Sequence, residues 1–201
     1  MSATLVLASA SPRRRELLRA AGLEFEVLPS AVPEVQRPGE AAVAFAQRLA
    51  IAKADDVARR RPGCRVLGAD TIVVVDDVVF GKPADRDAAR HMLRQLSGRT
   101  HRVLTAVALV EADGQRHEIL VESKVEFHVL HSDEIEHYLD SGEPFDKAGA
   151  YAVQGLARQF VSAVHGSYSN VVGLPVEEVV ALLCRLSGTP QTPATTPNTT
   201  R

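Results

Sequence analysis

The sequence of 201 residues predicts an α/β fold, and three observations support this prediction. Residues 66–75 form an almost continuous aliphatic run, which is the composition of a strand buried on both faces. Residues 40–60 carry apolar side chains at helical spacing, and residues 117–130 alternate apolar and polar side chains, as a strand with one solvated face does. Strand patterns and helix patterns therefore both occur along the chain.

The N-terminal segment predicts a short buried strand over residues 4–8 and a helix that begins at Ser11. Serine is a preferred helix cap, and the proline that follows it is a preferred first helical residue. Arg13 and Arg14 fall in the first turn, where the helix dipole disfavours cations. We therefore expect an anion here, held by backbone N–H groups, by the Ser9 or Ser11 hydroxyl and by both guanidinium groups. The alternative is a solvated basic patch.

The central strand carries polar residues inside its apolar run. Asp70 and Thr71 follow Gly68, which lets a ligand or another backbone come close. An ionised carboxylate in such a place is costly unless it meets a cation, a metal or hydrogen-bond donors. Two aspartates predict a turn after the strand, and a short return strand over residues 78–80 leads to Lys82. This arrangement suits a metal-bound phosphate; the alternative is a structural aspartate and a solvated lysine.

The other elements are predicted from caps, periodicity and composition. We expect further strands over residues 25–28, 103–110 and 160–164, and further helices that begin near Asp85 or Asp87, at Ser132 and near Pro175. The predicted buried side of the 40–60 helix is formed by Val43, Ala46, Leu49, Ala50 and Val57.

Three polar residues outside the central strand are further candidates. Lys53 lies on the 40–60 helix and can reach a cleft, although a surface position is the default for one lysine. Glu34 lies in a loop and is a candidate metal ligand, whereas loop acids are usually solvated. Gln154 lies in a segment rich in glycine and alanine, residues 145–155, which predicts a close-fitting pocket loop or merely a tight connection.

Composition argues against several classes of function. The formal net charge of −2 lacks the basic surplus of a general nucleic-acid binder, and an aromatic content of 4% without tryptophan supplies few stacking platforms. No stretch approaches a membrane span, and the two cysteines form neither a disulfide framework nor a zinc motif. We therefore expect a cytoplasmic protein that binds neither nucleic acid nor membrane. Residues 1–186 are predicted to form one domain, and residues 187–201 a disordered tail rich in Ser, Thr and Pro.

Three blocks of the sequence together resemble the Maf-like nucleotide pyrophosphatases. Residues 7–14 resemble the family's opening signature. Residues 68–71, together with 81–83 and 96–98, resemble its central block. Residues 146–155 resemble the late motif of its dTTP/UTP pyrophosphatase branch. The blocks occur in the family's order, and the resemblance runs from about Thr4 to Leu186. Ala152 stands where that branch commonly has glycine, which leaves the detail of the loop open.

The resemblance implies an α/β fold related to the inosine-triphosphate pyrophosphatases, with an elongated mixed β-sheet flanked by helices and two lobes around a cleft. It implies a homodimer and a metal-dependent hydrolase that cleaves a nucleoside triphosphate between its α- and β-phosphates, releasing pyrophosphate. Such an activity would prevent the incorporation of non-standard nucleotides. In family terms Asp70 is the proton acceptor, while Arg13, Thr71 and Gln154 are tied to substrate choice.

The charge requirements of a triphosphate agree with this interpretation, because phosphoryl transfer depends mostly on positioning and charge neutralisation. We expect Asp70 and Lys82 to be catalytic, and Asp70 with Glu34 to hold Mg²⁺ or Mn²⁺ alongside the phosphates. Asp70 would deprotonate a water at the metal for in-line attack on phosphorus. The polar residues expected to contact substrate are Ser9, Arg13, Arg14, Lys53, Thr71 and Gln154. One triphosphate can connect Asp70 and the arginines only if they lie within about 15 Å.

Base recognition leaves alternatives open. The Gln154 amide both donates and accepts, so it can pair with the imide edge of uracil or thymine, including modified pyrimidines. A carboxylate there would better suit 7-methylguanine, and a 7-methyl-GTP pyrophosphatase of the sibling branch is the first alternative. A nucleotide-sensing regulator of cell division without significant turnover is the second.

Overall fold

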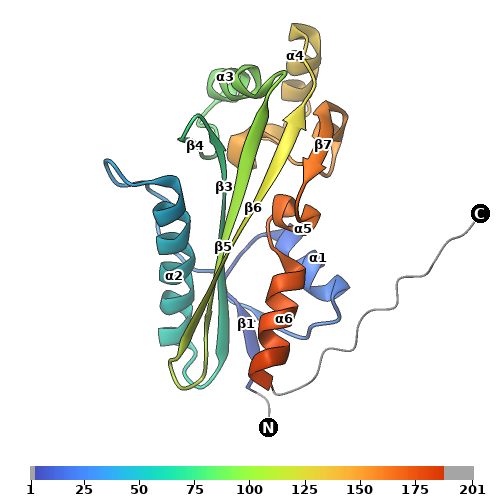
Figure 1. Cartoon of the computed structure of the whole chain (residues 1–201). Coiled ribbons are helices and arrows are strands. Elements are labelled where there is room, and N and C mark those ends of the chain that lie inside the picture. Colours follow the sequence, from blue (N-terminus) through green and yellow to red (C-terminus); the bar gives the residue numbers. More distant parts are fainter. Residues whose placement is uncertain (1–2, 188–201) are drawn as a thin grey trace, which may run out of the picture.

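The structure is a computed structural model, and it describes residues 3–187. Within these residues one seven-stranded sheet runs the length of the molecule in the order β2-β1-β3-β5-β6-β7, with β4 paired to β3 (Figure 1). The strands are β1 (Leu5–Leu7), β2 (Glu26–Val27), β3 (Arg65–Val75), β4 (Val78–Phe80), β5 (Thr100–Val110), β6 (Arg116–Phe127) and β7 (Val161–His165). Strand β1 is parallel to β2 and β3, and all other pairs are antiparallel. The predicted elongated mixed sheet is therefore confirmed.

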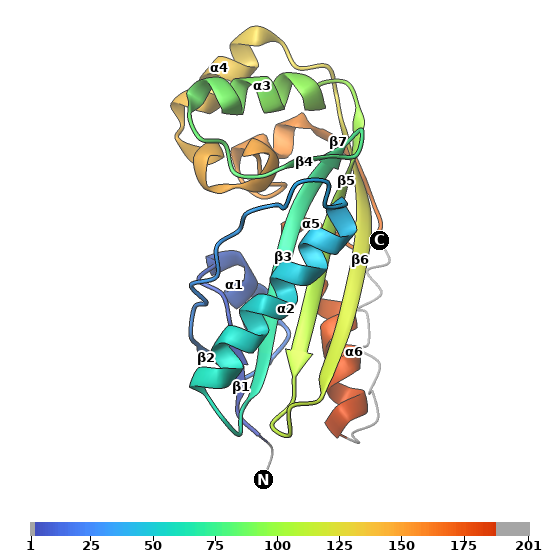
Figure 2. The same cartoon turned by 90° about the vertical axis from the view of Figure 1, so that its left-hand side faces the viewer.

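Helices cover the sheet on both faces and build a second lobe at one end. Helix α2 crosses one face, α1 and α6 lie on the other, and α3 and α4 gather at the far ends of the long strands (Figures 1 and 2). The α-helices are α1 (Pro12–Ala20), α2 (Ala42–Arg60), α3 (Arg86–Leu96), α4 (Ser132–Asp140), α5 (Tyr168–Val172) and α6 (Val176–Ser187). Three short 3₁₀ helices belong to the second lobe: η1 (Glu143–Asp146), η2 (Ala148–Ala150) and η3 (Leu156–Phe160).

Three groups of buried apolar side chains correspond to these layers. One lies between α2 and the sheet and includes Leu49 and Ile72, and a second lies beneath α1 and α6 and includes Leu18 and Leu182. The third fills the second lobe with aromatic and aliphatic side chains, among them Phe160. Because β3 and β5 contribute to all three groups, the long strands connect the two lobes rigidly.

Helix α2 approaches β3 most closely at Gly68. A Cβ atom built there would lie 2.4 Å from the Ala50 carbonyl oxygen and 2.6 Å from the Ala54 nitrogen. Only glycine fits such a contact, so the predicted close approach is that of the α2 backbone. This contact places Lys53 of α2 over Asp70, two residues after Gly68.

Several predicted strand boundaries were wrong. The strand predicted over residues 25–28 is only the two-residue β2, and both of its residues are exposed at the edge of the sheet. Strand β5 begins at Thr100, three residues earlier than predicted, because its start pairs with the end of β6. Strand β6 ends at Phe127, and Val129 beyond it is 67% exposed. The pairing of β6 with β7 shifts register between Glu126 and Phe127, so the alternation of apolar and polar residues no longer predicts the paired residues there.

Helix starts also differ in part from the predictions. Of the two predicted caps, Asp85 and Asp87, Asp85 is correct, because its carboxylate accepts a hydrogen bond from the Ala88 N–H at the start of α3. Helix α2 begins at Ala42, and its predicted core residue Val43 is 37% exposed. The residue before α4 is His131, and the predicted cap Ser132 is already helical.

The end of α6 lies at Ser187, which the sequence assigned to a disordered tail. The rest of that predicted tail falls outside the described residues. None of the helices within residues 3–187 combines the length and the apolar character needed to cross a bilayer.

Candidate active site

A pocket of about 350 Å³ lies between the two lobes and contains every residue that the sequence predicted for the site. The loop between β1 and α1, strand β3 and the segment that ends in Gly173 line one side, and residues 146–154 of the second lobe line the other. The predicted residues that line it are Ser9, Arg13, Arg14, Glu34, Lys53, Asp70, Thr71, Lys82 and Gln154. Residues far apart in the chain thus meet in one cleft, as the resemblance implies.

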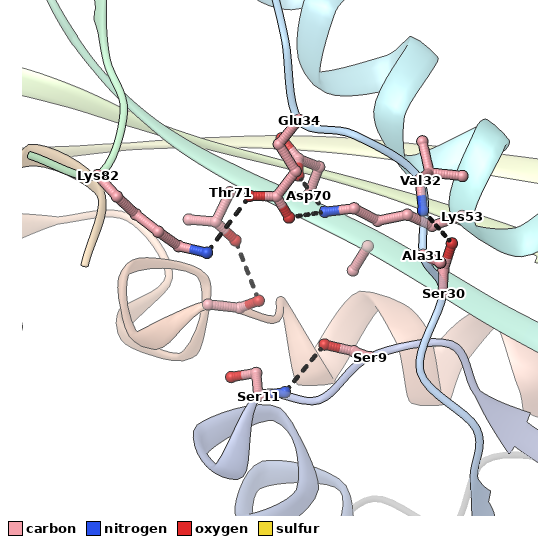
Figure 3. A network of polar contacts seen from close by, with 12 residues as sticks. Ser9, Ser11, Ser30, Ala31, Val32, Glu34, Lys53, Asp70, Thr71 and Lys82 are labelled. Atoms are coloured by element: carbon pink, nitrogen blue, oxygen red, sulfur yellow. Dashed lines mark hydrogen bonds and ion pairs between the residues drawn. The ribbon is translucent and has the colours of Figure 1, made fainter. Parts of the chain in front are cut away.

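Four charged side chains form a chain of ion pairs along this pocket (Figure 3). The Lys53 ammonium donates to Asp70 Oδ1 at 2.6 Å and to Glu34 Oε1 at 2.5 Å. Lys82 Nζ lies 3.4 Å from the other Glu34 oxygen. Alternating charges therefore lead from buried Asp70 to exposed Lys82 at the mouth of the pocket.

The surroundings shift the pKa values of Asp70 and Glu34 in opposite directions. Burial raises the pKa of Asp70, and the nearby Lys53 and Arg14 only partly oppose this effect. Burial also acts to raise the pKa of Glu34, but Lys53 and Lys82 outweigh it and leave that pKa below its usual value. Because a general base works best with a pKa near the operating pH, Asp70 is suited to accept a proton while Glu34 stays charged.

The same carboxylates fit a hard divalent cation. Both contact one ammonium nitrogen, so their nearest oxygens lie within about 5 Å of each other. No group of three or more metal-ligating side chains occurs among residues 3–187. Magnesium commonly needs only one or two carboxylates and takes its remaining ligands from phosphates and water. Asp70 and Glu34 therefore fit such an ion in the presence of a polyphosphate, with Lys53 sharing their oxygens.

Arg14 is buried, and its hydrogen bonds go to the protein. Its guanidinium group donates to the carbonyl oxygens of Ala69 and Gly173 at 2.9 and 2.8 Å, and to the Ser9 and Thr71 hydroxyls at 3.2 and 3.0 Å. The contact with Ala69, the neighbour of Asp70, places the guanidinium group well inside the 15 Å limit. Arg14 therefore connects the walls of the pocket that it lines, and its contact with substrate stays a prediction.

The Thr71 hydroxyl is similarly occupied. It accepts from Arg14, lies 3.1 Å from the Gly173 carbonyl oxygen and 3.0 Å from the Thr105 hydroxyl. These contacts use the hydroxyl's hydrogen-bonding capacity. Thr71 also lines the pocket, and its part in substrate choice stays a prediction.

Three other predicted residues present polar groups to the pocket. Arg13 is partly exposed and has no hydrogen-bond or ion-pair partner among residues 3–187, so its guanidinium group is free to bind an anion. Gln154 is exposed at the opposite wall. Ser9 accepts from the Ser11 N–H at 3.2 Å, which folds the loop over the start of α1 (Figure 3).

Sequence reasoning missed two contributors to this pocket. The Gly173 carbonyl accepts from both Arg14 and Thr71, and nothing in the residue type announces such a backbone contact. Tyr151 lines the pocket from the second lobe while its hydroxyl contacts His101. His101 sits in a strand pattern and carries no sequence signal for this contact.

The chain matches the family model described as Maf-like protein over residues 4–186. It is 52% identical to a dTTP/UTP pyrophosphatase of Hahella chejuensis, over 89% of this chain and 90% of that protein. It is also 50% identical to a nucleoside triphosphate pyrophosphatase of Xylella fastidiosa, over 89% of this chain and 96% of that protein. Among solved structures, a HAM1 protein from Coxiella burnetii has a TM-score of 0.51 at 18% identity, covering 91% of this chain and 99% of that one. This last likeness concerns the fold alone and agrees with the predicted α/β architecture.

Proposed function

The chain belongs to the Maf-like protein family, and from this membership we propose that it is a nucleoside triphosphate pyrophosphatase that hydrolyses dTTP and UTP to the monophosphate and pyrophosphate. The observation that carries the proposal is the convergence of all the predicted polar residues on one pocket between the lobes. Relatives about half identical over nine-tenths of the chain bear the name of this activity.

The phosphates are expected to bind along the cationic wall of the pocket. Arg13 offers a free guanidinium group. In the first turn of α1, Pro12 has no N–H and the Arg14 N–H donates to the Ser11 hydroxyl, so the Arg13 N–H is the backbone donor left for the same anion. Lys82 and Lys53 neutralise charge on the opposite side. Phosphoryl transfer needs mainly this positioning and neutralisation, and the four donors supply both.

Asp70 is the group proposed to take a proton from the attacking water. It is the most deeply buried carboxyl in the pocket, and its raised pKa makes it the stronger base of the two. Lys53 holds its Oδ1 atom, which fixes the carboxyl group's orientation. A bound Mg²⁺ or Mn²⁺ would be held by Asp70 and Glu34 and would withdraw charge from the phosphates. Metal dependence is part of this proposal.

The base is expected to lie against the second lobe, where Gln154 faces the pocket. A carboxamide can donate to one atom and accept from another, which complements the imide edge of uracil and thymine. The homodimer and the cytoplasmic location remain predictions.

Incubation of the purified protein with a panel of triphosphates tests the proposal. With Mg²⁺ or Mn²⁺ present, we expect release of pyrophosphate from dTTP and UTP faster than from purine triphosphates, and loss of turnover in EDTA. Faster hydrolysis of 7-methyl-GTP would favour the sibling activity. Tight nucleotide binding without pyrophosphate release would instead support a sensor that does not turn over.

A further inference from the structure

The segment that carries Gln154 is held in an uncommon backbone conformation. Ala150 before it has a φ of 61°, in the left-handed region that non-glycine residues rarely adopt, and Gly155 after it has a φ of 103°. Such conformations persist where the surrounding structure over-determines them. Two polar contacts, one at each end of residues 151–156, restrain this segment: the first is buried and the second lies at the surface of the lobe. Neither uses a residue of the proposed phosphate-binding or proton-transfer machinery.

The first contact joins His101 of β5 to Tyr151. The His101 Nε2 atom lies 2.7 Å from the Tyr151 hydroxyl, and both residues are buried. The two rings and that of Phe127 pack edge to face, with centroids 4.8 to 5.3 Å apart. His101 Nδ1 has no partner among residues 3–187, so the Tyr151 hydroxyl is the one polar group that this buried imidazole contacts within the described chain.

The second contact is made by Glu143 at the other end of the segment. Its Oε2 atom accepts from the Leu156 N–H at 3.1 Å, and its Oε1 atom accepts from the Tyr138 hydroxyl at 3.1 Å. The carboxylate also packs against Gly155, where an added Cβ would lie 2.8 Å from both oxygens. Glu143 thus holds the start of η3 and the residue that follows Gln154.

We propose that His101 and Glu143 are positioning residues for base selection, acting through Tyr151 and through the Leu156 N–H to hold Gln154 at the pocket wall. This inference rests on the proposed function, because it assumes that the base binds at Gln154. A hydrogen bond to a base edge depends on donor and acceptor placement within a few tenths of an ångström, and both anchors restrain the backbone that sets this placement. Asp70, Lys53 and Arg13 lie on other elements and do not contact the anchors.

Substitution of the first anchor separates positioning from stability. His101→Phe and Tyr151→Phe each leave one buried polar group without a partner, whereas the double variant removes both and should recover most of the thermal stability. Positioning predicts that all three variants raise KM for dTTP by about five- to tenfold, keep kcat within about twofold, and lose preference for dTTP over dGTP. His91→Phe, at an exposed position on α3, is the matched control and should change neither constant.

The second anchor provides an independent test with a conservative rescue. Glu143→Leu removes both acceptors and is expected to raise KM in the same way. Glu143→Gln can still accept from the Leu156 N–H while its amide donates to Tyr138, and it should restore KM to near the wild-type value. Glu16→Leu, at an exposed position on α1, is the matched control.

The outcomes distinguish failure of this inference from failure of the proposed function. A wild-type protein that does not hydrolyse dTTP overturns the proposed function, and the inference with it. A wild-type protein that hydrolyses dTTP, together with unchanged KM and base preference in His101→Phe and Glu143→Leu, overturns the inference alone. Recovery of KM together with stability in the double variant would also overturn it, because both losses would then follow from folding.

Discussion

Replacing Lys53 with methionine tests whether the ion pairs of the pocket hold the buried carboxyl group in its charged form. Methionine retains much of the side chain's length and apolar contact but removes the ammonium group. In the native protein this group lies 2.6 Å from Asp70 and 2.5 Å from Glu34, and the Lys53 and Asp70 side chains are only 8% and 7% exposed. The variant leaves the two carboxyl groups close together without the cation between them.

The expected cost follows from burial. Removal of one partner of a buried ion pair costs about 3–5 kcal/mol, because the other charge remains uncompensated. Glu34 is 45% exposed and Arg14 still attracts Asp70, so we expect the lower end of this range, about 3 kcal/mol at pH 8. For a domain of this size such a loss lowers Tm by about 6–12 °C.

Acidification should reduce this cost. Burial already raises the pKa of Asp70, and loss of Lys53 raises it further. The folded variant therefore binds a proton at Asp70 at a pH where the unfolded chain does not, so its stability relative to the wild type rises as pH falls. Neutral Asp70 needs no counter-charge, and the difference between the two proteins at pH 5 should be well below that at pH 8.

Urea denaturation in EDTA at pH 8 and pH 5 measures both quantities. Lys124→Met, which changes an exposed lysine on β6, serves as the matched control and should alter the free energy of unfolding by less than about 0.5 kcal/mol. In an Asp70→Asn background, Lys53→Met should cost clearly less than in the wild type. A difference at pH 8 no larger than that of the control, or one equal at both pH values, would refute the reasoning.

Three further predictions follow from the structure. Gly68→Ala places a Cβ 2.4 Å from the Ala50 carbonyl oxygen and should destabilise the protein by about 3 kcal/mol. Calorimetry compares it with Gly81→Ala, whose added Cβ meets nothing within 4 Å. Equal Tm values for the two variants would contradict the close approach of α2 to β3. Burial lowers the pKa of His101 to about 4 from 6.5, so the unfolded chain takes up a proton over this window that the folded chain does not. The free energy of unfolding should therefore fall by about 3 kcal/mol as pH drops from 6.5 to 4, and His101→Phe should lack this component of the urea-derived pH profile; identical slopes would argue against it. Gln154→Glu should shift base preference from dTTP toward 7-methyl-GTP in competition assays, and an unchanged preference would remove Gln154 from base recognition.

The charged residues of the pocket were predictable because the sequence places them where they are unfavourable without a ligand or a partner. A carboxylate in an apolar strand requires a counter-charge, and two arginines at a helix start oppose the helix dipole. Both sets of residues lie in the same pocket, where Asp70 meets Lys53 and the Arg13 guanidinium group has no partner among residues 3–187. The direction of Arg14 was not predictable, because its acceptors at Ala69 and Gly173 are backbone carbonyls that any residue could provide.

Element ends were harder to predict than element types. The alternation of β6 continues in sequence to Val129, but pairing stops at Phe127, where the partner strand β5 begins. The helical spacing of α2 includes Val43, yet Val43 in the first turn is 37% exposed, whereas Ala46 and Ala50 farther along the helix are buried. Periodicity reports which face an element would bury, and tertiary contacts decide how far the burial extends.

The two anchors of the Gln154 segment illustrate the same limit. His101 lies before the strand predicted over residues 103–110, and its buried hydrogen bond to Tyr151 joins residues 50 positions apart. Glu143 lies just after the end of α4, and its hydrogen bond to the Leu156 N–H spans a segment of short 3₁₀ helices that has no periodic sequence pattern. Contacts of this kind depend on the packing of the second lobe and become visible only in the structure.

Pyrophosphate release from dTTP by Asp70→Asn tests the central claim most directly. Asparagine keeps the shape of the side chain but cannot accept a proton from water, so kcat should fall by at least about 100-fold. The variant should stay folded, because Lys53 keeps its ion pair with Glu34 at 2.5 Å. Turnover at the wild-type rate in a folded variant would show that the buried carboxyl group is not the proton acceptor.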